Sequence, residues 1–361
     1  MGSTENHAGI EREPVDEATS ARPSGLKHVR PGSHAIRVKT FLERERKFTV
    51  PTDFQLPMGL GESIPKRAFT STYFDTADYR LGHGGVTLRR RVEARSSVWQ
   101  LKLPREEGRL ELEWRGGRVH PPQPVKDLLV AWLRGSELAP IARLHTVRTR
   151  RRVNGDEGSR AEVVLDVVRV LGGRRVVRQF TEVEVELQEG DQAILDQVSS
   201  TLQEAGATLS SGRPKVFQAL GLDFPHIPQP AEPSASTIEH LSARLAICVW
   251  DMLHHDPGTR LGDQPEELHQ MRVAVRRFRS LLRAAKSLLE ASWVTALRTE
   301  LAWLGQVLGQ VRELDVFIAQ CHSDAAVLRP EERKAINRLL GRLSAERRKA
   351  RTELAEALTS P

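Results

Sequence analysis

Acidic and basic side chains recur at every second position in several short segments of the sequence. Residues 180–187 read Phe-Thr-Glu-Val-Glu-Val-Glu-Leu, and residues 42–48 place Glu43, Glu45 and Lys47 on one side. This period of two is typical of a β-strand, whose successive side chains point to opposite faces of the sheet. Each segment is therefore predicted to be a strand with one charged face.

Four further segments follow the same pattern. Their charged members are Arg89 and Arg91 in 86–92, Lys102 in 98–103, Arg109, Glu111 and Glu113 in 109–114, and Arg148, Arg150 and Arg152 in 146–152. An antiparallel sheet with one face in water would explain one such strand. Carboxylates about 7 Å apart on one face repel one another, however, unless cations lie between them. We therefore predict a closed barrel in which acidic and basic strands face each other across a lumen.

The predicted lumen suits a polyanion together with a divalent metal ion. Arginine and lysine bind phosphate oxygens, and carboxylates bind Mg²⁺ or Mn²⁺, which prefer oxygen ligands. Asp166 and Lys215 complete the predicted set of charges. The set includes no aromatic platform for a nucleobase, which favours a small polyphosphate over a nucleotide. A purely structural network of salt bridges is the alternative.

The same residues occur in an order that resembles CYTH domains, also called triphosphate tunnel metalloenzymes. Glu43-Arg-Glu45-Arg-Lys47 is similar to the ExExK signature, and the later blocks follow in family order. These blocks are Tyr73-Phe-Asp75-Thr76, Leu88-Arg89-Arg90-Arg91, Lys102 in Trp-Gln-Leu-Lys, Arg109-Leu-Glu111, Asp166, Glu182-Val-Glu184-Val-Glu186-Leu, and Lys215. The resemblance covers residues 37–222. It implies an α+β fold with an eight-stranded antiparallel β-barrel, or tunnel, and flanking helices.

The resemblance also implies a role for each group of side chains. Catalysis would depend on Glu43, Glu45 and Lys47. Mg²⁺ or Mn²⁺ would be held by Glu43 and Glu45 with Asp166, Glu182, Glu184 and Glu186, and it stays open which two of the last three ligate. Phosphates would be bound by Lys47, Arg89, Arg91, Lys102, Arg109, Arg148, Arg150, Arg152 and Lys215.

Members of this family differ in their chemistry. Some hydrolyse inorganic triphosphate, thiamine triphosphate or RNA 5′-triphosphates, and others cyclise ATP. Metal-dependent hydrolysis of inorganic triphosphate is predicted here. The alternatives are a non-catalytic polyphosphate-binding protein and another triphosphate chemistry, either ATP cyclisation or thiamine triphosphate hydrolysis.

The pattern becomes helical after a proline-rich linker at 223–236. Four helices are predicted near 237–254, 265–289, 293–322 and 330–358, enough for one all-α bundle. The second carries a basic stripe beside its apolar face, made of His269, Arg272, Arg276, Arg279, Arg283 and Lys286. Like charges at these steps destabilise a helix, so the stripe predicts a groove for a polyanion. A solvated basic face is the alternative.

Two of these helical segments together resemble the CHAD domain, a helical module that is often fused to CYTH domains and associated with inorganic polyphosphate. The segments are residues 268–279 and Leu-Gly-Gln-Val-Arg312-Glu-Leu-Asp315-Val. Arg312 therefore joins the predicted polyphosphate-binding set, although an ion pair with Asp315 would be purely structural. Residues 237–361 amount to about half of the usual CHAD length, which implies a partial bundle or a homodimer that completes the surface.

Composition narrows the classes of partner. The chain has 361 residues, a net charge of +7 and 39% hydrophobic residues, which suits packed cores and an acidic partner. Nucleic acid is disfavoured because no aromatic stacking pattern accompanies the basic stripe. Residues 1–36 are predicted to form a disordered tail. Without an apolar leader or an apolar run of about 20 residues, a cytoplasmic protein with no membrane contact is predicted.

Overall fold

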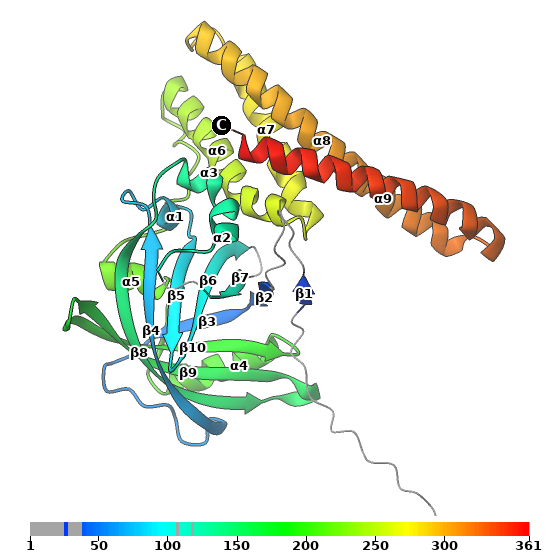
Figure 1. Ribbon diagram of the computed structural model, residues 1–361. Coiled ribbons are helices and arrows are strands. Elements are labelled where there is room, and N and C mark those ends of the chain that lie inside the picture. The colour runs from blue at the N-terminus through cyan, green and yellow to red at the C-terminus, as the bar shows by residue number, and fades with distance from the viewer. Residues whose placement is uncertain (1–24, 28–37, 106–107, 117–118, 361) are drawn as a thin grey trace, which may run out of the picture.

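The computed structural model describes residues 25–27, 38–105, 108–116 and 119–360, and one curled antiparallel sheet dominates the first part of the chain (Figure 1). Its strands run in the order β1-β2-β7-β6-β5-β4-β8-β9-β10-β3-β11. They are β1 (Gly25–Lys27), β2 (Val38–Glu43), β3 (Glu45–Thr49), β4 (Glu62–Asp75), β5 (Thr87–Glu93), β6 (Ser96–Arg105), β7 (Gly108–Arg115), β8 (Ala139–Asn154), β9 (Arg160–Gly172), β10 (Arg175–Glu189) and β11 (Thr208–Leu209).

A single segment of the chain joins the two ends of the curled sheet. Glu43 of β2 pairs with Arg109 of β7, and Glu45 of β3 pairs with Glu186 of β10. Only Arg44 separates β2 from β3, so the sheet closes on itself at this point. The predicted antiparallel tunnel is confirmed, but the number of strands differs. The single strand expected over 42–48 is divided in two, and the short strands β1 and β11 are added at the edges.

Strand β1 lies within the predicted tail 1–36 and pairs with β2. The remainder of the predicted tail lies outside the described residues.

The apolar faces of the strands point outward, where short helices cover them. Trp99, Leu112 and Trp114 pack against residues of α2 (Gln123–Leu128) and α3 (Val130–Leu133). On another side, Val183 and Val185 pack against α4 (Ala193–Glu204). Helices α1 (Arg80–His83) and α5 (Lys215–Leu220) complete this part. Because the apolar side chains lie outside the barrel, the alternating charged ones are directed inward.

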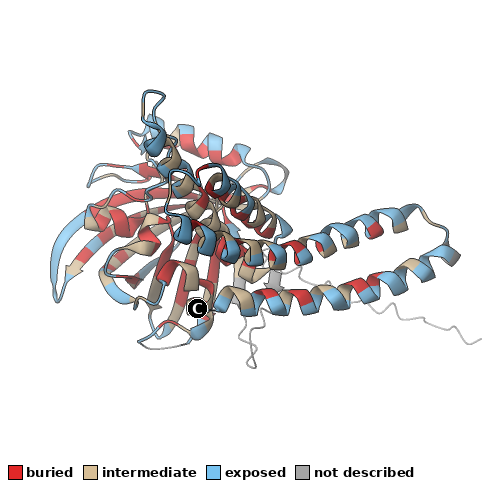
Figure 2. Cartoon of the chain, turned by 90° about the horizontal axis from the view of Figure 1, so that it is seen from above, coloured by how far each residue is buried: buried red, intermediate tan, exposed pale blue. Residues whose placement is uncertain are grey.

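The C-terminal part of the chain is helical, as predicted. Its helices are α6 (Thr237–Leu261), α7 (Pro265–Ala284), α8 (Ala291–Val327) and α9 (Pro330–Thr359). Leu268, Val275 and Leu282 of α7 pack with Leu301 and Leu308 of α8 in a shared core. The outer parts of α8 and α9 pair with each other and project beyond the rest of the molecule (Figures 1 and 2).

Three predicted helix ends were wrong, and one of them is that of α8, which continues to Val327 rather than ending near 322. The first helix was expected to end near 254, ahead of Pro257, but α6 continues through Pro257 to Leu261. Proline costs a helix one hydrogen bond, and here residues 256–259 are buried, so tertiary packing compensates for that loss. Helix α7 ends at Ala284 rather than near 289, which places Lys286 beyond its end.

No helix among the described residues is both long enough and apolar enough to cross a membrane.

Helix α6 contains a buried histidine that should make stability depend on pH. His254 stacks on Trp250 with ring centroids 4.5 Å apart, and burial together with the neighbouring His255 lowers its pKa to about 4. An unfolded chain takes up this proton near pH 6.5, whereas the folded chain resists it until about pH 4. Stability is therefore present above pH 6.5 and falls by roughly 2–3 kcal/mol as pH drops to 4.

His254→Phe should remove this part of the acid sensitivity, because phenylalanine can stack on Trp250 but cannot take up a proton. Urea unfolding followed by helix circular dichroism at pH 7.5, 5.5 and 4.5 measures the effect. His322→Phe, at an exposed position on α8, is the control and should keep the wild-type pH slope. Equal slopes for His254→Phe and wild type would contradict the assignment.

Candidate functional site

The inward faces of the strands enclose a charged cavity of about 280 Å³. It is lined by Phe41, Glu43, Glu45, Lys47, Arg67, Tyr73, Thr87, Arg89, Arg91, Gln100, Lys102, Arg109, Glu111, Glu113, Arg148, Arg150, Glu162, Val164, Glu184, Glu186, Pro214 and Lys215. Most of these residues come from strands, and Lys215 enters from the first turn of α5. Residues far apart in the sequence thus converge on one space because every second residue of each strand faces it.

The structure brings most of the predicted tunnel residues to this cavity, with three exceptions. Asp166 and Glu182 are buried behind the lining, where both contact Lys215. Arg152 is exposed near the end of β8 and does not line the cavity.

Sequence reasoning missed five polar lining residues, one of which, Thr87, shares the inward face of β5 with Arg89 and Arg91. Glu162 and Gln100 follow the same alternation as Asp166 on β9 and Lys102 on β6, so the period of two was a sufficient signal for both. Arg67 and Tyr73 share a face of β4. That strand lacks a run of alternating charges, and its inward face could not be identified from its charges.

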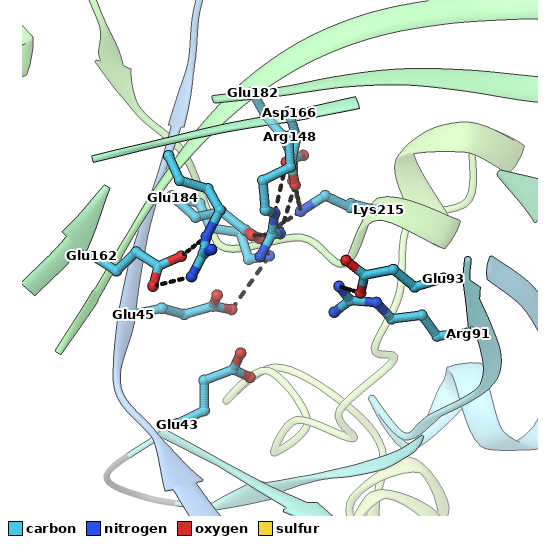
Figure 3. Close-up of polar contacts among 12 residues, drawn as sticks. Glu43, Glu45, Arg91, Glu93, Arg148, Glu162, Asp166, Glu182, Glu184 and Lys215 are labelled. Carbon is cyan, nitrogen blue, oxygen red and sulfur yellow. Dashed lines mark hydrogen bonds and ion pairs between the residues drawn. The ribbon is translucent and has the colours of Figure 1, made fainter. Parts of the chain in front are cut away.

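One end of the tunnel is a closed network of paired charges, seen in the upper part of Figure 3. The ammonium of Lys215 lies 2.7 Å from Glu184 Oε1 and 3.2 Å from Asp166 Oδ2, and it also contacts Glu182. Arg148 donates two hydrogen bonds to Asp166, at 2.8 and 2.7 Å, and Lys47 pairs with Glu184. Three cations therefore balance three carboxylates.

The pKa values in this network follow from its pairing. Burial opposes the charged forms. At Lys215 and Glu184 the opposite charges outweigh burial, raising the pKa of Lys215 above its ordinary value and holding the pKa of Glu184 well below its own. At Glu182 burial is the larger effect and raises the pKa. Oxygen atoms of Asp166, Glu182 and Glu184 lie within 4.8 Å of one another, close enough to share a metal ion. The cation among them is the ammonium of Lys215.

A second group of carboxylates has fewer cations. Lys102 Nζ lies 2.7 Å from Glu43 Oε1 and 3.0 Å from Glu111 Oε2. Arg150 binds Glu162 through two hydrogen bonds of 2.6 and 2.9 Å.

The side chain of Glu186 makes no hydrogen bond or ion pair within the described parts of the chain. Burial, with the nearby carboxylates of Glu43, Glu162 and Glu45, raises its pKa to about 7. Surplus negative charge and oxygen donors are what a hard divalent ion requires. Glu43, Glu45 and Glu186 therefore offer the donor chemistry that such an ion needs, whereas the described carboxylates whose oxygens already lie within 4.8 Å of one another are Asp166, Glu182 and Glu184.

Basic side chains crowd the wall that includes β4 and β5. Burial, Arg89 and Arg148 lower the pKa of Arg91, whose guanidinium is bound 2.6 Å from Glu93 Oε2. Arg89 donates to Gln100 at 2.7 Å and to the Tyr73 hydroxyl at 3.2 Å. The cavity therefore has a surplus of negative charge near Glu186 and a surplus of positive charge near Arg91.

The predicted basic stripe on α7 is partly in contact with α8. A methyl group added at Gly309 would lie 3.5 Å from Arg272 Nε, and one added at Gly305 would lie 3.8 Å from Arg279 Nη1. These two guanidiniums therefore lie along the groove between α7 and α8. Asp315 pairs with Arg347 and with Arg351 of α9, not with Arg312.

The members of the predicted polyphosphate-binding set form no ion pair with any acidic residue that the structure describes. They are His269, Arg272, Arg276, Arg279, Arg283, Lys286 and Arg312.

Two proteins of Mycobacterium tuberculosis are similar to most of this chain. Uncharacterized protein Rv2226 and Uncharacterized protein MT2285 are each 30% identical to it over 329 residues, covering 82% of this chain and 62% of the relative. The chain thus spans less than two thirds of the length of these relatives.

The solved structures that match part of this chain have low sequence identity to it. PH1819 from Pyrococcus horikoshii OT3 is 17% identical, covers 50% of this chain and 98% of its own, and has a TM-score of 0.35. A putative adenylyl cyclase from Hippeastrum, described as having a dominant triphosphatase activity, is 19% identical with coverages of 51% and 99% and a TM-score of 0.32.

Matches to two domain families account for both halves of the chain. Residues 42–214 match the CYTH domain and residues 243–361 match the CHAD domain. The first range contains the tunnel, and the second contains the basic stripe and Arg312. This chain therefore contains a CYTH domain followed by a CHAD domain.

Proposed function

We propose that the tunnel hydrolyses inorganic triphosphate with the help of Mg²⁺ or Mn²⁺. The observation that carries this proposal is the division of charge within one enclosed cavity. The carboxylates around Glu186, which include Glu43 and Glu45, exceed the nearby positive charge, whereas the guanidinium of Arg91 is crowded by those of Arg89 and Arg148. A triphosphate with its metal ion complements both surpluses at once.

The residues have separate tasks in this proposal. Glu43, Glu45 and Glu186 would hold the metal ion, which when bound neutralises phosphate charge and lowers the pKa of a water molecule. Arg91 and Arg109 would bind phosphate oxygens, because guanidinium groups match their geometry. Lys102 fixes Glu43 through its hydrogen bonds. Phosphoryl transfer depends mainly on such positioning and on electrostatic stabilisation.

The size and lining of the cavity favour a small substrate. A volume of about 280 Å³ is near the lower limit for small-molecule sites, about 300 Å³. The structure adds Tyr73 to the lining, but its hydroxyl accepts a hydrogen bond from Arg89. Phe69, on the same face of β4, is only 3% exposed. Neither ring offers a free surface on which a nucleobase could stack. Phe41, which is half-buried, is the other aromatic residue of the lining, so the preference for inorganic triphosphate over ATP rests on the small volume of the cavity.

Glu43→Ala and Glu45→Ala should each lower kcat for triphosphate by about 100-fold or more, the effect expected when one electrostatic group of an active site is lost. Phosphate release with Mg²⁺ or Mn²⁺ measures the change. ATP and thiamine triphosphate are assayed in parallel, because family members also act on these compounds.

The control is Glu62→Ala, which removes an exposed carboxylate at the start of β4 and should leave the rate unchanged. Robust phosphate release without a divalent metal would contradict the proposal. Tight triphosphate binding with no turnover would favour the non-catalytic alternative.

We also propose that the CHAD domain binds longer polyphosphate along the groove between α7 and α8. Arg272 and Arg279 lie close to Gly309 and Gly305 of α8, where the absence of larger side chains lets both guanidinium groups lie at the contact between the two helices. Neither arginine has an acidic partner among the residues described. Unpaired like charges on one helix face lower stability, and bound phosphates would relieve that repulsion.

Arg272→Ala combined with Arg276→Ala should weaken polyphosphate binding by about tenfold or more, since each hydrogen bond between charged groups contributes about 1.5–3 kcal/mol. The salt dependence of the affinity should also become shallower, because fewer phosphate charges are neutralised. Calorimetry with long-chain polyphosphate at several salt concentrations measures both effects.

Lys334→Ala combined with Arg338→Ala is the matched control. It removes two basic residues at the same spacing from exposed positions of α9, and the affinity should change little. An equal loss of polyphosphate affinity in both double variants would show that binding depends only on the net charge of the protein and would contradict the proposed site.

A further inference from the structure

We propose that Phe69 is a positioning residue for the tunnel, whose ring face holds the guanidinium groups of Arg91 and Arg148 in place. The inference deepens the proposed function, on which it rests, because it concerns how the phosphate-binding wall is organised.

The geometry places one aromatic ring beneath two cations. The Cζ atom of Arg91 lies 3.9 Å from the ring centroid of Phe69, and that of Arg148 lies 5.5 Å from the same centroid. Both distances are within the roughly 6 Å over which a cation is attracted to an aromatic face. Phe69 is buried although it lies on the inward face of β4.

The register of the sheet explains this contact. Arg91 of β5 pairs with Ser71 and Arg148 of β8 pairs with Arg67, so each arginine is a diagonal neighbour of Phe69 on one of its two sides. Diagonal neighbours on one face are within reach of aromatic and long side chains. The ring therefore fills the space between the two strands and meets both guanidiniums.

An aromatic ring at position 69 can attract both guanidinium groups, which an aliphatic side chain cannot do. Two guanidiniums in a buried wall repel each other, and the pKa of Arg91 is lowered by burial, by Arg89 and by Arg148. The negative face of the ring attracts both cations without adding a full negative charge that would repel phosphate. A carboxylate in this position would hold the arginines but would also oppose the substrate.

The two arginines depend on Phe69 to different degrees. Arg148 is also fixed by Asp166 and by Glu184, at 2.7 and 3.1 Å. Arg91 has Glu93 as its partner, at 2.6 Å. Loss of the ring should therefore displace mainly Arg91 and weaken substrate binding more than it slows the chemical step.

A fluorination series at position 69 tests the inference with little change in side-chain shape. 4-Fluoro-, 3,5-difluoro- and 3,4,5-trifluorophenylalanine progressively weaken the negative ring face. The KM for triphosphate should rise stepwise, by about tenfold over the series, while kcat stays within about twofold. The same series at Phe48, which is packed in the outer core, should leave KM unchanged. A KM that is constant across the series at position 69 would overturn the inference.

A second measurement does not depend on turnover. In the wild-type protein without substrate, the ring of Phe69 should shift the Nε–H proton resonance of Arg91 upfield, and Phe69→Leu should abolish this shift. If the Arg91 Nε–H proton has the same chemical shift in Phe69→Leu as in the wild type, the contact between Arg91 and the ring of Phe69 is contradicted.

The two proposals can fail separately. If the wild type binds triphosphate without hydrolysing it, the Kd for triphosphate is measured across the same fluorination series in place of KM. A graded Kd would support the inference while the proposed hydrolysis fails. Normal hydrolysis with a KM that is constant across the series would support the proposed hydrolysis and overturn the inference about Phe69.

Discussion

The structure depends on the neutralisation of charges inside the curled sheet. Glu43, Lys47, Asp166, Glu182 and Glu184 are all buried, and an unpaired buried charge costs several kcal/mol. Within the closed network, Lys47, Arg148 and Lys215 supply the counter-charges from β3, β8 and α5. The chain can bury so many ionised groups because strands of opposite charge face each other across a narrow cavity.

The same constraint divides the tunnel into two parts with different uses. Where Lys215 and Arg148 lie among the carboxylates of Asp166, Glu182 and Glu184, opposite charges are paired. Around Glu186 the carboxylates outnumber the cations, and around Arg91 the cations crowd one another. A ligand of mixed charge would relieve both imbalances. The incomplete part of the network is thus where chemistry is expected, and the complete part holds it in shape.

The CHAD domain is attached near the strands that line this cavity. Arg105, at the end of β6, lies 3.0 Å from Glu267 in the first turn of α7, and Glu267 also pairs with His255 of α6 at 2.9 Å. Lys102 lies on the same strand as Arg105. The helix with the basic stripe therefore begins at the tunnel domain, which places the two proposed phosphate-binding surfaces on one connected framework.

Prediction from the sequence succeeded where it relied on local periodicity. The alternation in the strands placed Glu43, Glu45, Lys102 and Arg150 on one inward surface, and the same rule applied to β6 and β9 would have added Gln100 and Glu162. It failed where a helix end depended on packing, as at Pro257. Arg152 obeys the period and still lies outside the cavity, because alternation gives the face of a side chain but not its depth along the tunnel.

The amino-acid order alone determined which side chains share a face, because β-strand geometry repeats every two residues whatever surrounds it. Only the tertiary structure decided which charges meet. Lys215 comes from a helix yet neutralises Asp166 and Glu184, and Asp315 pairs with Arg347 and Arg351 rather than with nearby Arg312. Such pairings depend on distances between segments far apart in the chain, and those distances are set by how the sheet closes and the helices pack.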